Sequence, residues 1–166
     1  MAYEFVGKLY DEFELNKQYF TSARTITEAD VVNFAGLSGD FSALHINEEY
    51  AKNSIYGTRI AYGALTYIIS TGLVCQTGMF DGSYIGLLGC EMKFTNPVRF
   101  QDTISCVMTP VEKRLSRKPG RGIIRFHVET INQKNEVVAD QYWTILMATD
   151  REHMEGFPIV CFLWNR

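Results

Sequence analysis

The residues best suited to chemistry gather in one loop in the first third of the chain. Asp40 directly follows Gly39, and His45 lies five positions after Asp40. A carboxylate and an imidazole side by side can hold one water molecule and exchange protons with it, since both groups change protonation state readily. The alternative is a turn residue followed by a hydrogen-bonded structural histidine, which the spacing alone does not exclude. Asp40 and His45 are therefore the candidate catalytic pair.

A second candidate feature is the start of an apolar helix. The run Gly57-Thr-Arg-Ile-Ala-Tyr-Gly63 leads into it, and no Ser, Thr, Asp or Asn stands immediately before Gly63 to cap its first turn. Free amides beside a glycine suit a developing oxyanion and would polarise the carbonyl of a thioester. Water could equally cap this helix, so both interpretations stay open.

Short helices are expected on either side of the Asp40 loop. Thr27, followed by Asp30, resembles a capping box and predicts a helix over 28–37. Asn47, followed by two glutamates, predicts another helix start. The uncharged segment that follows predicts a long helix from about Gly63 to Gly78.

The second half of the chain changes to a period of two residues, which is typical of half-buried strands. Strands are expected at 84–95, 103–115, 123–131 and 136–148, with Pro97 and Pro110 marking edges or breaks. This order predicts an α+β fold in which an antiparallel sheet curls around the long helix.

Composition limits the classes of protein. The 166 residues are 46% hydrophobic with a formal net charge of -3 and no basic cluster, which predicts a single domain and argues against nucleic acid as partner. The domain is expected to cover 1–150, and the apolar tail 151–166 to pack on it or on a partner subunit. The uncharged stretch 60–80 is long enough to span a bilayer, but its polar residues and glycines favour a buried core helix, so we expect no membrane association.

The cysteines and the amino terminus bear on the compartment. The four cysteines contain no Cys-x-x-Cys pair, and the first residues lack the apolar centre of a signal peptide, which together predict a cytoplasmic protein with reduced thiols. No metal-ligand spacing, phosphate loop or dinucleotide fingerprint is present in the sequence. We therefore expect neither a metal nor a redox cofactor.

Three segments carry a resemblance to a known family. Phe34–His45, Gly57–Gly63 and Phe94–Arg99 with Asp102-Thr103 look like the MaoC-like dehydratases, or R-specific enoyl-CoA hydratases of the hydratase 2 type, over roughly residues 15 to 148. The resemblance implies the hot dog fold, a sheet wrapped around a long central helix. It also implies a homodimer or higher homo-oligomer whose sheets join, with an acyl-thioester site near the subunit interface.

The same resemblance assigns roles to residues. Asp40 and His45 match the family's catalytic pair, without deciding which is acid and which is base, and Gly63 matches the glycine whose amide binds the thioester oxygen. The expected substrate-binding residues are Gly63, Tyr62, Ala64, Thr71 and Phe34. The chain departs from the family where Ser42 and Ala43 replace Asn and Pro, where Tyr62 replaces His, and where Gln101 replaces Gly.

The function implied is reversible addition of water to a short trans-2-enoyl thioester, giving the R-3-hydroxyacyl form. Coenzyme A or acyl carrier protein would carry the acyl group as part of the substrate, and no other cofactor is expected. One alternative is a hot dog acyl-CoA thioesterase, which directs water at the carbonyl carbon. Another is a non-catalytic subunit that binds acyl thioesters.

Overall fold

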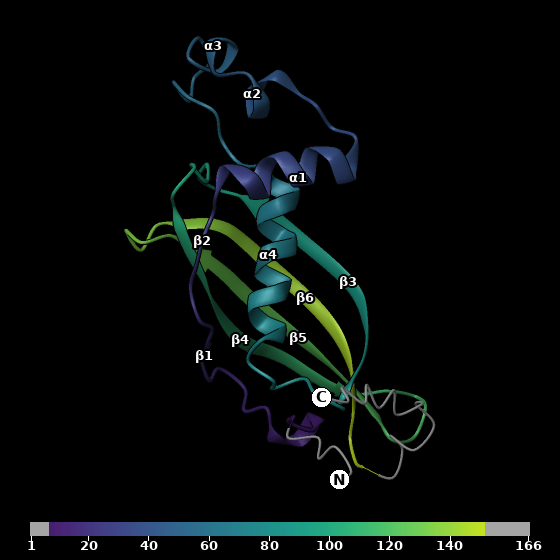
Figure 1. Cartoon of the computed structure of the whole chain (residues 1–166). Helices are drawn as coiled ribbons and strands as arrows, with labels where there is room; N and C mark the ends of the chain where they lie inside the picture. The colour runs from purple at the N-terminus through teal and green to yellow at the C-terminus, as the bar shows by residue number, and fades with distance from the viewer. Residues whose placement is uncertain (1–6, 152–166) are drawn as a thin grey trace, which may run out of the picture.

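The fold is seen in a computed structural model that describes residues 7–151 (Figure 1). Its helical segments are η1 (Tyr10–Glu12), α1 (Glu28–Ser38), α2 (Ala43–Ile46), α3 (Glu48–Ala51) and α4 (Gly63–Cys75). Its strands are β1 (Tyr19–Phe20), β2 (Arg24–Thr25), β3 (Tyr84–Phe94), β4 (Thr103–Leu115), β5 (Arg121–Ile131) and β6 (Val137–Ala148). The helices therefore precede the long strands, as expected for this α+β chain.

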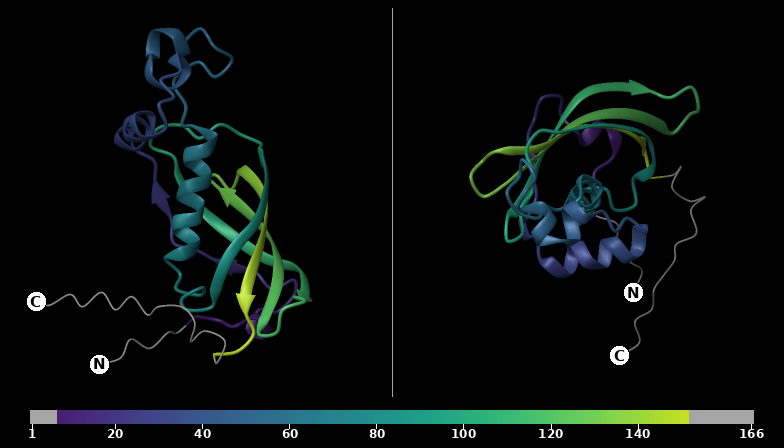
Figure 2. Two further views of the ribbon diagram at one scale, coloured as in Figure 1. Left: turned by 90° about the vertical axis from the view of Figure 1, so that its right-hand side faces the viewer. Right: turned by 90° about the horizontal axis from the view of Figure 1, so that it is seen from above.

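The strands form one antiparallel sheet in the order β1-β4-β5-β6-β3, and β2 also pairs with β4. Along β4 and β5, buried and partly buried residues alternate, so every second side chain faces inward. Figure 2 shows the sheet curving around α4, with α1 crossing the amino end of that helix. One edge strand, β3, pairs only with β6 within the described residues.

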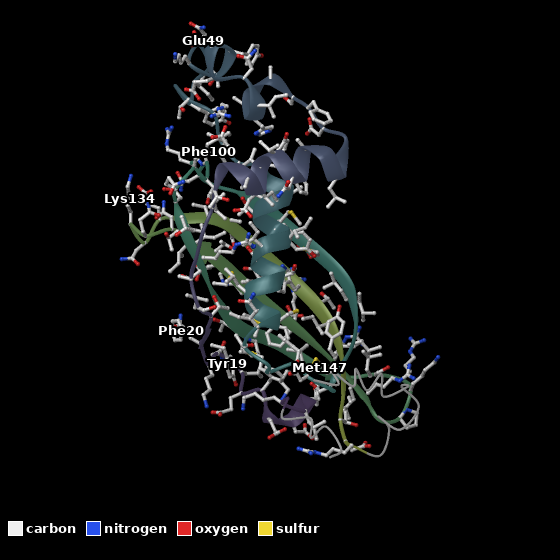
Figure 3. The ribbon with its side chains drawn as sticks, in the orientation of Figure 1. Tyr19, Phe20, Glu49, Phe100, Lys134 and Met147 are labelled. Carbon is white, nitrogen blue, oxygen red and sulfur yellow. The ribbon has the colours of Figure 1, made fainter. Side chains whose placement is uncertain are left out.

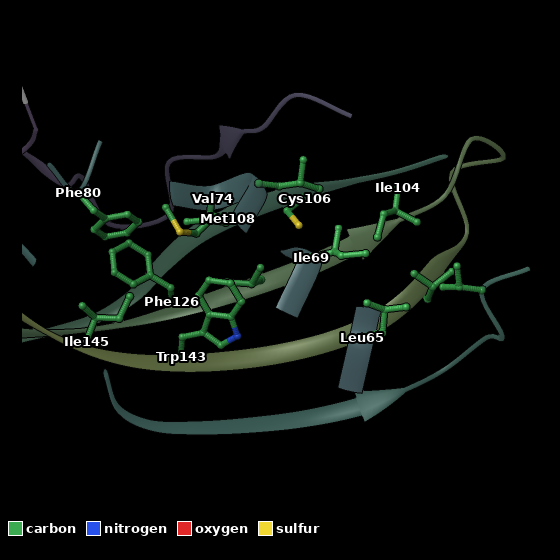
Figure 4. Packing of buried hydrophobic residues seen from close by; sticks show 14 of the residues in the cluster. Leu65, Ile69, Val74, Phe80, Ile104, Cys106, Met108, Phe126, Trp143 and Ile145 are labelled. Carbon is green, nitrogen blue, oxygen red and sulfur yellow. The ribbon is translucent and has the colours of Figure 1, made fainter. Parts of the chain in front are cut away.

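The long helix α4 is the centre of the core. It contains no charged residue, and it buries Leu65, Thr66, Ile69, Ser70, Leu73 and Val74. Ile69 and Val74 pack among inward side chains of the sheet, including Ile104, Met108 and Phe126 (Figure 4). Removing this much apolar surface from water is the main stabilisation of the fold, at about 25 cal/mol per Å².

A hydrogen-bonded polar cluster lies inside this core. The Ser70 hydroxyl is 2.8 Å from the Thr130 hydroxyl, and the Gln141 side-chain amide donates to the same Thr130 oxygen at 2.9 Å. The Trp143 indole N–H donates to Gln141 Oε1 at 3.1 Å. Ser70, Thr130 and Gln141 are all fully buried. Because buried polar groups are costly unless paired, this cluster fixes the register of α4 against the sheet and the orientation of the Trp143 ring.

The predicted helices and long strands agree closely with the structure. The structure also contains η1, β1 and β2, which the sequence did not predict, and it differs at three further points. The long helix ends at Cys75 instead of near Gly78, because Thr77 hydrogen-bonds back to Val74 and Gly78 adopts a left-handed φ of 70°. Pro110 lies within β4, where the pairing with β5 shifts register. The loop between the short helices contains one further helical turn, α2.

Two expectations concern the ends of the chain and the membrane. The predicted packing of the tail 151–166 concerns residues beyond Arg151, which lie outside the described part of the chain. Within 7–151, no helix combines the length and apolar character that crossing a bilayer requires.

Replacing Thr130 by valine tests the polar cluster. The change keeps the side-chain shape but leaves Ser70 and Gln141 without their shared partner, so the free energy of unfolding should fall by about 1–3 kcal/mol. Urea denaturation measures the free energy of unfolding of each variant. The control is Thr109→Val, the same change on the outward face of β4, which should cost much less. Equal losses for the two variants would show that the cluster contributes no special stability.

Candidate functional site

The loop that carries Asp40 starts from a left-handed turn. Gly39 ends α1 with φ 75°, and its amide donates to the Ala35 carbonyl at 2.9 Å. The Ser42 amide then donates to Asp40 Oδ1 at 2.9 Å, closing an Asx turn. Asp40 is exposed, and its Oδ2 makes no hydrogen bond with any residue of 7–151. One carboxylate oxygen therefore fixes the loop, and the other remains available to a ligand.

His45 is held in place through one of its ring nitrogens. Its Nδ1 lies 2.8 Å from the carbonyl oxygen of Ile60. Because a carbonyl can only accept a hydrogen bond, Nδ1 carries the proton, and Nε2 of the neutral ring is left as a proton acceptor. Ile60 is itself fixed by a bridge to Arg99, so the ring is tied to the body of the domain.

Tyr62 joins the two candidate catalytic residues. It is 3% exposed, and its hydroxyl donates to the backbone carbonyl of Asp40 at 2.6 Å. Its ring lies 3.8 Å from the His45 ring and 5.0 Å from the Phe34 ring, centroid to centroid. Burial, and then the charge of Asp40, raises the pKa of Tyr62, so the hydroxyl stays protonated and remains a donor.

The start of α4 is open next to these residues. Tyr62 is the N-cap but offers no side-chain hydrogen bond to the first turn. The amides of Gly63, Ala64 and Leu65 donate to no group among residues 7–151, whereas Thr66 donates to the Tyr62 carbonyl at 3.0 Å. Free amides at a helix start attract a negatively charged or polarised oxygen.

Gly63 also has a packing role. A Cβ built at this position would lie 2.8 Å from the ring of Phe94, at the end of β3. A side chain at residue 63 would have to displace that ring. The glycine therefore lets an apolar ring lie close to the open amides, and an apolar neighbour strengthens electrostatic interactions there.

An ion-pair cluster anchors the segment that carries α2 and α3. The Glu48 carboxylate accepts hydrogen bonds from the Thr58 hydroxyl at 2.9 Å and from Arg59 Nε at 3.1 Å. Arg59 also reaches Glu28 of α1 at 2.6 Å and lies over the Phe100 ring, which is labelled in Figure 3. These bonds, led by that from Thr58, lower the pKa of Glu48. The cluster thereby ties α3 and the start of α1 to the segment that leads into α4.

A cavity of about 350 Å³ lies further along α4, between that helix and the strands β3 and β6. Tyr67, Thr71 and Cys75 of the helix line one side, Trp143 lines the other, and Asp81 lies in the turn before β3. Most of its lining is apolar or aromatic, which is typical of pockets for small organic ligands.

The structure brings some of the predicted site residues together and separates others. Asp40, His45, Phe34, Tyr62 and Gly63 converge at the amino end of α4. Ala64 is exposed in the first turn of the helix. Thr71 lies two turns further on, where its hydroxyl donates to the Ile68 carbonyl at 2.7 Å and its side chain lines the cavity.

Sequence reasoning missed Arg59, Asp81 and Trp143. Arg59 belongs to the Gly57–Gly63 motif, which could have drawn attention to it, whereas Asp81 and Trp143 carry no local signal. Within residues 7–151, no group of three His, Cys, Asp or Glu side chains is arranged to hold a metal ion.

Tyr62→Phe tests how the Asp40 loop is held. The variant keeps the ring contact with His45 but loses the hydrogen bond to Asp40, which is worth about 1 kcal/mol. Amide hydrogen exchange of peptides covering 39–45 should become faster. The matched control is Tyr50→Phe, on the exposed face of α3, which should leave that exchange unchanged. Unaltered exchange in Tyr62→Phe would contradict the role given to the hydroxyl.

Comparison with known proteins agrees with this geometry. The chain is 39% identical over 88 residues to the (R)-specific enoyl-CoA hydratase of Rhodospirillum rubrum, covering 52% of this chain and 59% of that protein. The structure resembles a MaoC-like dehydratase from the same organism with a TM-score of 0.79 at 26% identity, covering 86% of this chain and 97% of the other. A Mycobacterium tuberculosis protein described as a double hotdog fold matches with a TM-score of 0.76 at 17% identity, covering 87% and 45% of the two chains.

These matches bear on both the fold and the family. The chain spans 33% and 59% of the lengths of two curated relatives that it matches. The antiparallel sheet around α4 is a hot dog fold, as the resemblance in the sequence implied. The family model for the MaoC like domain matches residues 13–132, so this chain belongs to the MaoC-like dehydratase family.

Proposed function

We propose that this chain catalyses the reversible addition of water to a trans-2-enoyl thioester, giving an R-3-hydroxyacyl thioester. Coenzyme A or acyl carrier protein would present the acyl group. The observation that carries the proposal is the convergence of Asp40, His45 and the open amide of Gly63 around Tyr62. A relative at 39% identity is named an (R)-specific enoyl-CoA hydratase, which supports the same reaction.

Each group has one task in this reaction. The thioester oxygen accepts a hydrogen bond from the Gly63 amide, which stabilises the enolate-like charge that forms as water attacks the β carbon. One O–H bond of water breaks, a C–O bond forms at the β carbon, and the α carbon gains a proton. Asp40 and His45 hold the water between them, one accepting its proton and the other delivering one. His45 Nε2 is the ring nitrogen available for this, because Nδ1 is bound to Ile60.

Loss of enoyl absorbance with crotonyl-CoA tests the reaction. Asp40→Asn and His45→Gln should each lower turnover by about 100-fold or more, because each removes a proton-transfer group. Matched controls are Asp11→Asn, exposed in η1, and His127→Gln, on the outward face of β5, both expected to keep wild-type rates. A folded Asp40→Asn protein with undiminished turnover would overturn the assignment.

Two other outcomes identify the alternatives. Release of free thiol together with loss of the thioester would make the protein a thioesterase. Binding of acyl-CoA without any turnover, across several enoyl chain lengths, would make it a non-catalytic binder. Free thiol is therefore assayed in parallel with absorbance.

We further propose that two copies associate along β3. This edge strand is bulged and exposes large apolar side chains, among them Leu88 at 54% and Phe94 at 50%, and Ile68 of the neighbouring α4 is 48% exposed. An apolar unpaired edge favours association with another strand. A second copy can satisfy the strand's free backbone groups and cover these side chains at once.

Sedimentation velocity measures this association. Leu88→Lys places a charge in the proposed interface, and the variant should sediment as a monomer at concentrations where the wild type is a dimer. Leu115→Lys, at the far end of β4 and 68% exposed, is the control. A Leu88→Lys protein that dimerises as strongly as the wild type would place the interface elsewhere.

A further inference from the structure

The cavity beside α4 lies on the same flank of the helix as the proposed reaction site. Gly63, Tyr67 and Thr71 are spaced four residues apart and therefore share one flank of the helix. Tyr67 and Thr71 line the cavity, so it begins about one turn beyond the open amide of Gly63. A thioester whose oxygen binds Gly63 would have its acyl chain pointing along this flank.

The path from Gly63 along the helix into the cavity sets the length of chain that fits. Eight residues of helix separate Gly63 from Thr71, which is about 12 Å at 1.5 Å per residue. An extended chain advances about 1.2 Å per bond, so this distance corresponds to roughly ten bonds. The cavity volume of about 350 Å³ has the space of roughly a dozen waters. The path from Gly63 to Thr71 is therefore longer than a four-carbon acyl group spans.

Trp143 forms a rigid wall of the cavity. Its N–H is held by Gln141, which is held in turn by Thr130, and its ring meets Tyr67 edge to face at 6.0 Å. An indole fixed by a fully buried network cannot turn aside without breaking that network. The cross-section available to a chain between α4 and β6 is thus set by Trp143.

Among residues 7–151, the only charged side chain that lines the cavity is acidic. Asp81 belongs to the turn that lines its far end, and no lysine or arginine of the described residues takes part in the lining. No ion pair within 7–151 involves Asp81. Burial, and then the charge of Asp81, raises the pKa of the Cys75 thiol in the cavity wall. A second carboxylate arriving there would meet like charge at close range.

We propose that this cavity receives the uncharged tail of a medium-length acyl chain of about eight carbons, and that Asp81 makes it reject chains ending in a carboxylate. This rests on the proposed function for the placement of the thioester at Gly63. It extends that function by naming the acyl group, a chain longer than the short substrate expected from the sequence.

Binding of saturated acyl-CoAs tests the inference without depending on turnover. Calorimetry compares butyryl-CoA, octanoyl-CoA and the eight-carbon acyl-CoA that ends in a carboxylate. Octanoyl-CoA should bind at least about tenfold tighter than butyryl-CoA, because four more methylenes leave water. The carboxylate-ended chain should bind about tenfold weaker than octanoyl-CoA. Equal affinity of the three would overturn the proposal.

Two variants assign the effects to the cavity. Asp81→Asn should bring the carboxylate-ended chain to within about threefold of octanoyl-CoA, while Asp11→Asn should not. Thr71→Leu fills part of the cavity and should reduce the preference for octanoyl over butyryl, whereas Gln76→Leu, exposed at the helix end, should keep it. An unchanged preference in Thr71→Leu would place the acyl chain elsewhere.

Turnover separates this inference from the proposed function. Hydration of crotonyl-CoA combined with no preference for octanoyl-CoA would support the hydratase function and overturn the cavity assignment. The expected preference for octanoyl-CoA without any hydration would support the cavity assignment and overturn the hydratase function.

Discussion

The burial of α4 is the constraint on which the rest of the structure depends. A helix with no charged residue must be covered on most of its surface, and a sheet can cover it only by curving. The polar side chains Thr66 and Ser70 face inward as well, and they are tolerated because each is hydrogen-bonded, Ser70 to Thr130 of the sheet. The helix is thus fixed in position and register. The open amides at its amino end and the cavity along its flank, the two features that could bind a ligand, are fixed with it.

The amino end of α4 is left without a side-chain cap. Tyr62 contributes no cap, and instead reaches across to the Asp40 carbonyl and lies against the His45 ring. One residue therefore connects Asp40 and His45 to the open amides. Tyr62 stands where the family resemblance led us to expect histidine, and its ring and hydroxyl supply contacts of their own. The Arg59 cluster holds the same loop from its other end.

Sequence reasoning was most accurate where local pattern decides the structure. The bounds of β4 agree to the residue, and the capping box at Thr27 and Asp30 is present. The α2 turn was missed because a four-residue helix has almost no periodic signal, and Ser42 and Ala43 gave no cap to identify it. Sequence reasoning could not predict the role of Tyr62, the polar cluster at Thr130 or the cavity between α4 and β6. All three join residues far apart in the chain, and only the packed fold brings them into contact.

In the proposed function, the Gly63 amide binds the thioester oxygen beside Asp40 and His45. The most direct test is the backbone amide spectrum of nitrogen-15-labelled protein during titration with butyryl-CoA, a saturated thioester with no double bond to hydrate. The Gly63 amide resonance should move as the ligand saturates, and its exchange with water should slow. Saturable binding that leaves the Gly63 resonance unmoved would contradict this role of Gly63, because the thioester oxygen would then lie elsewhere.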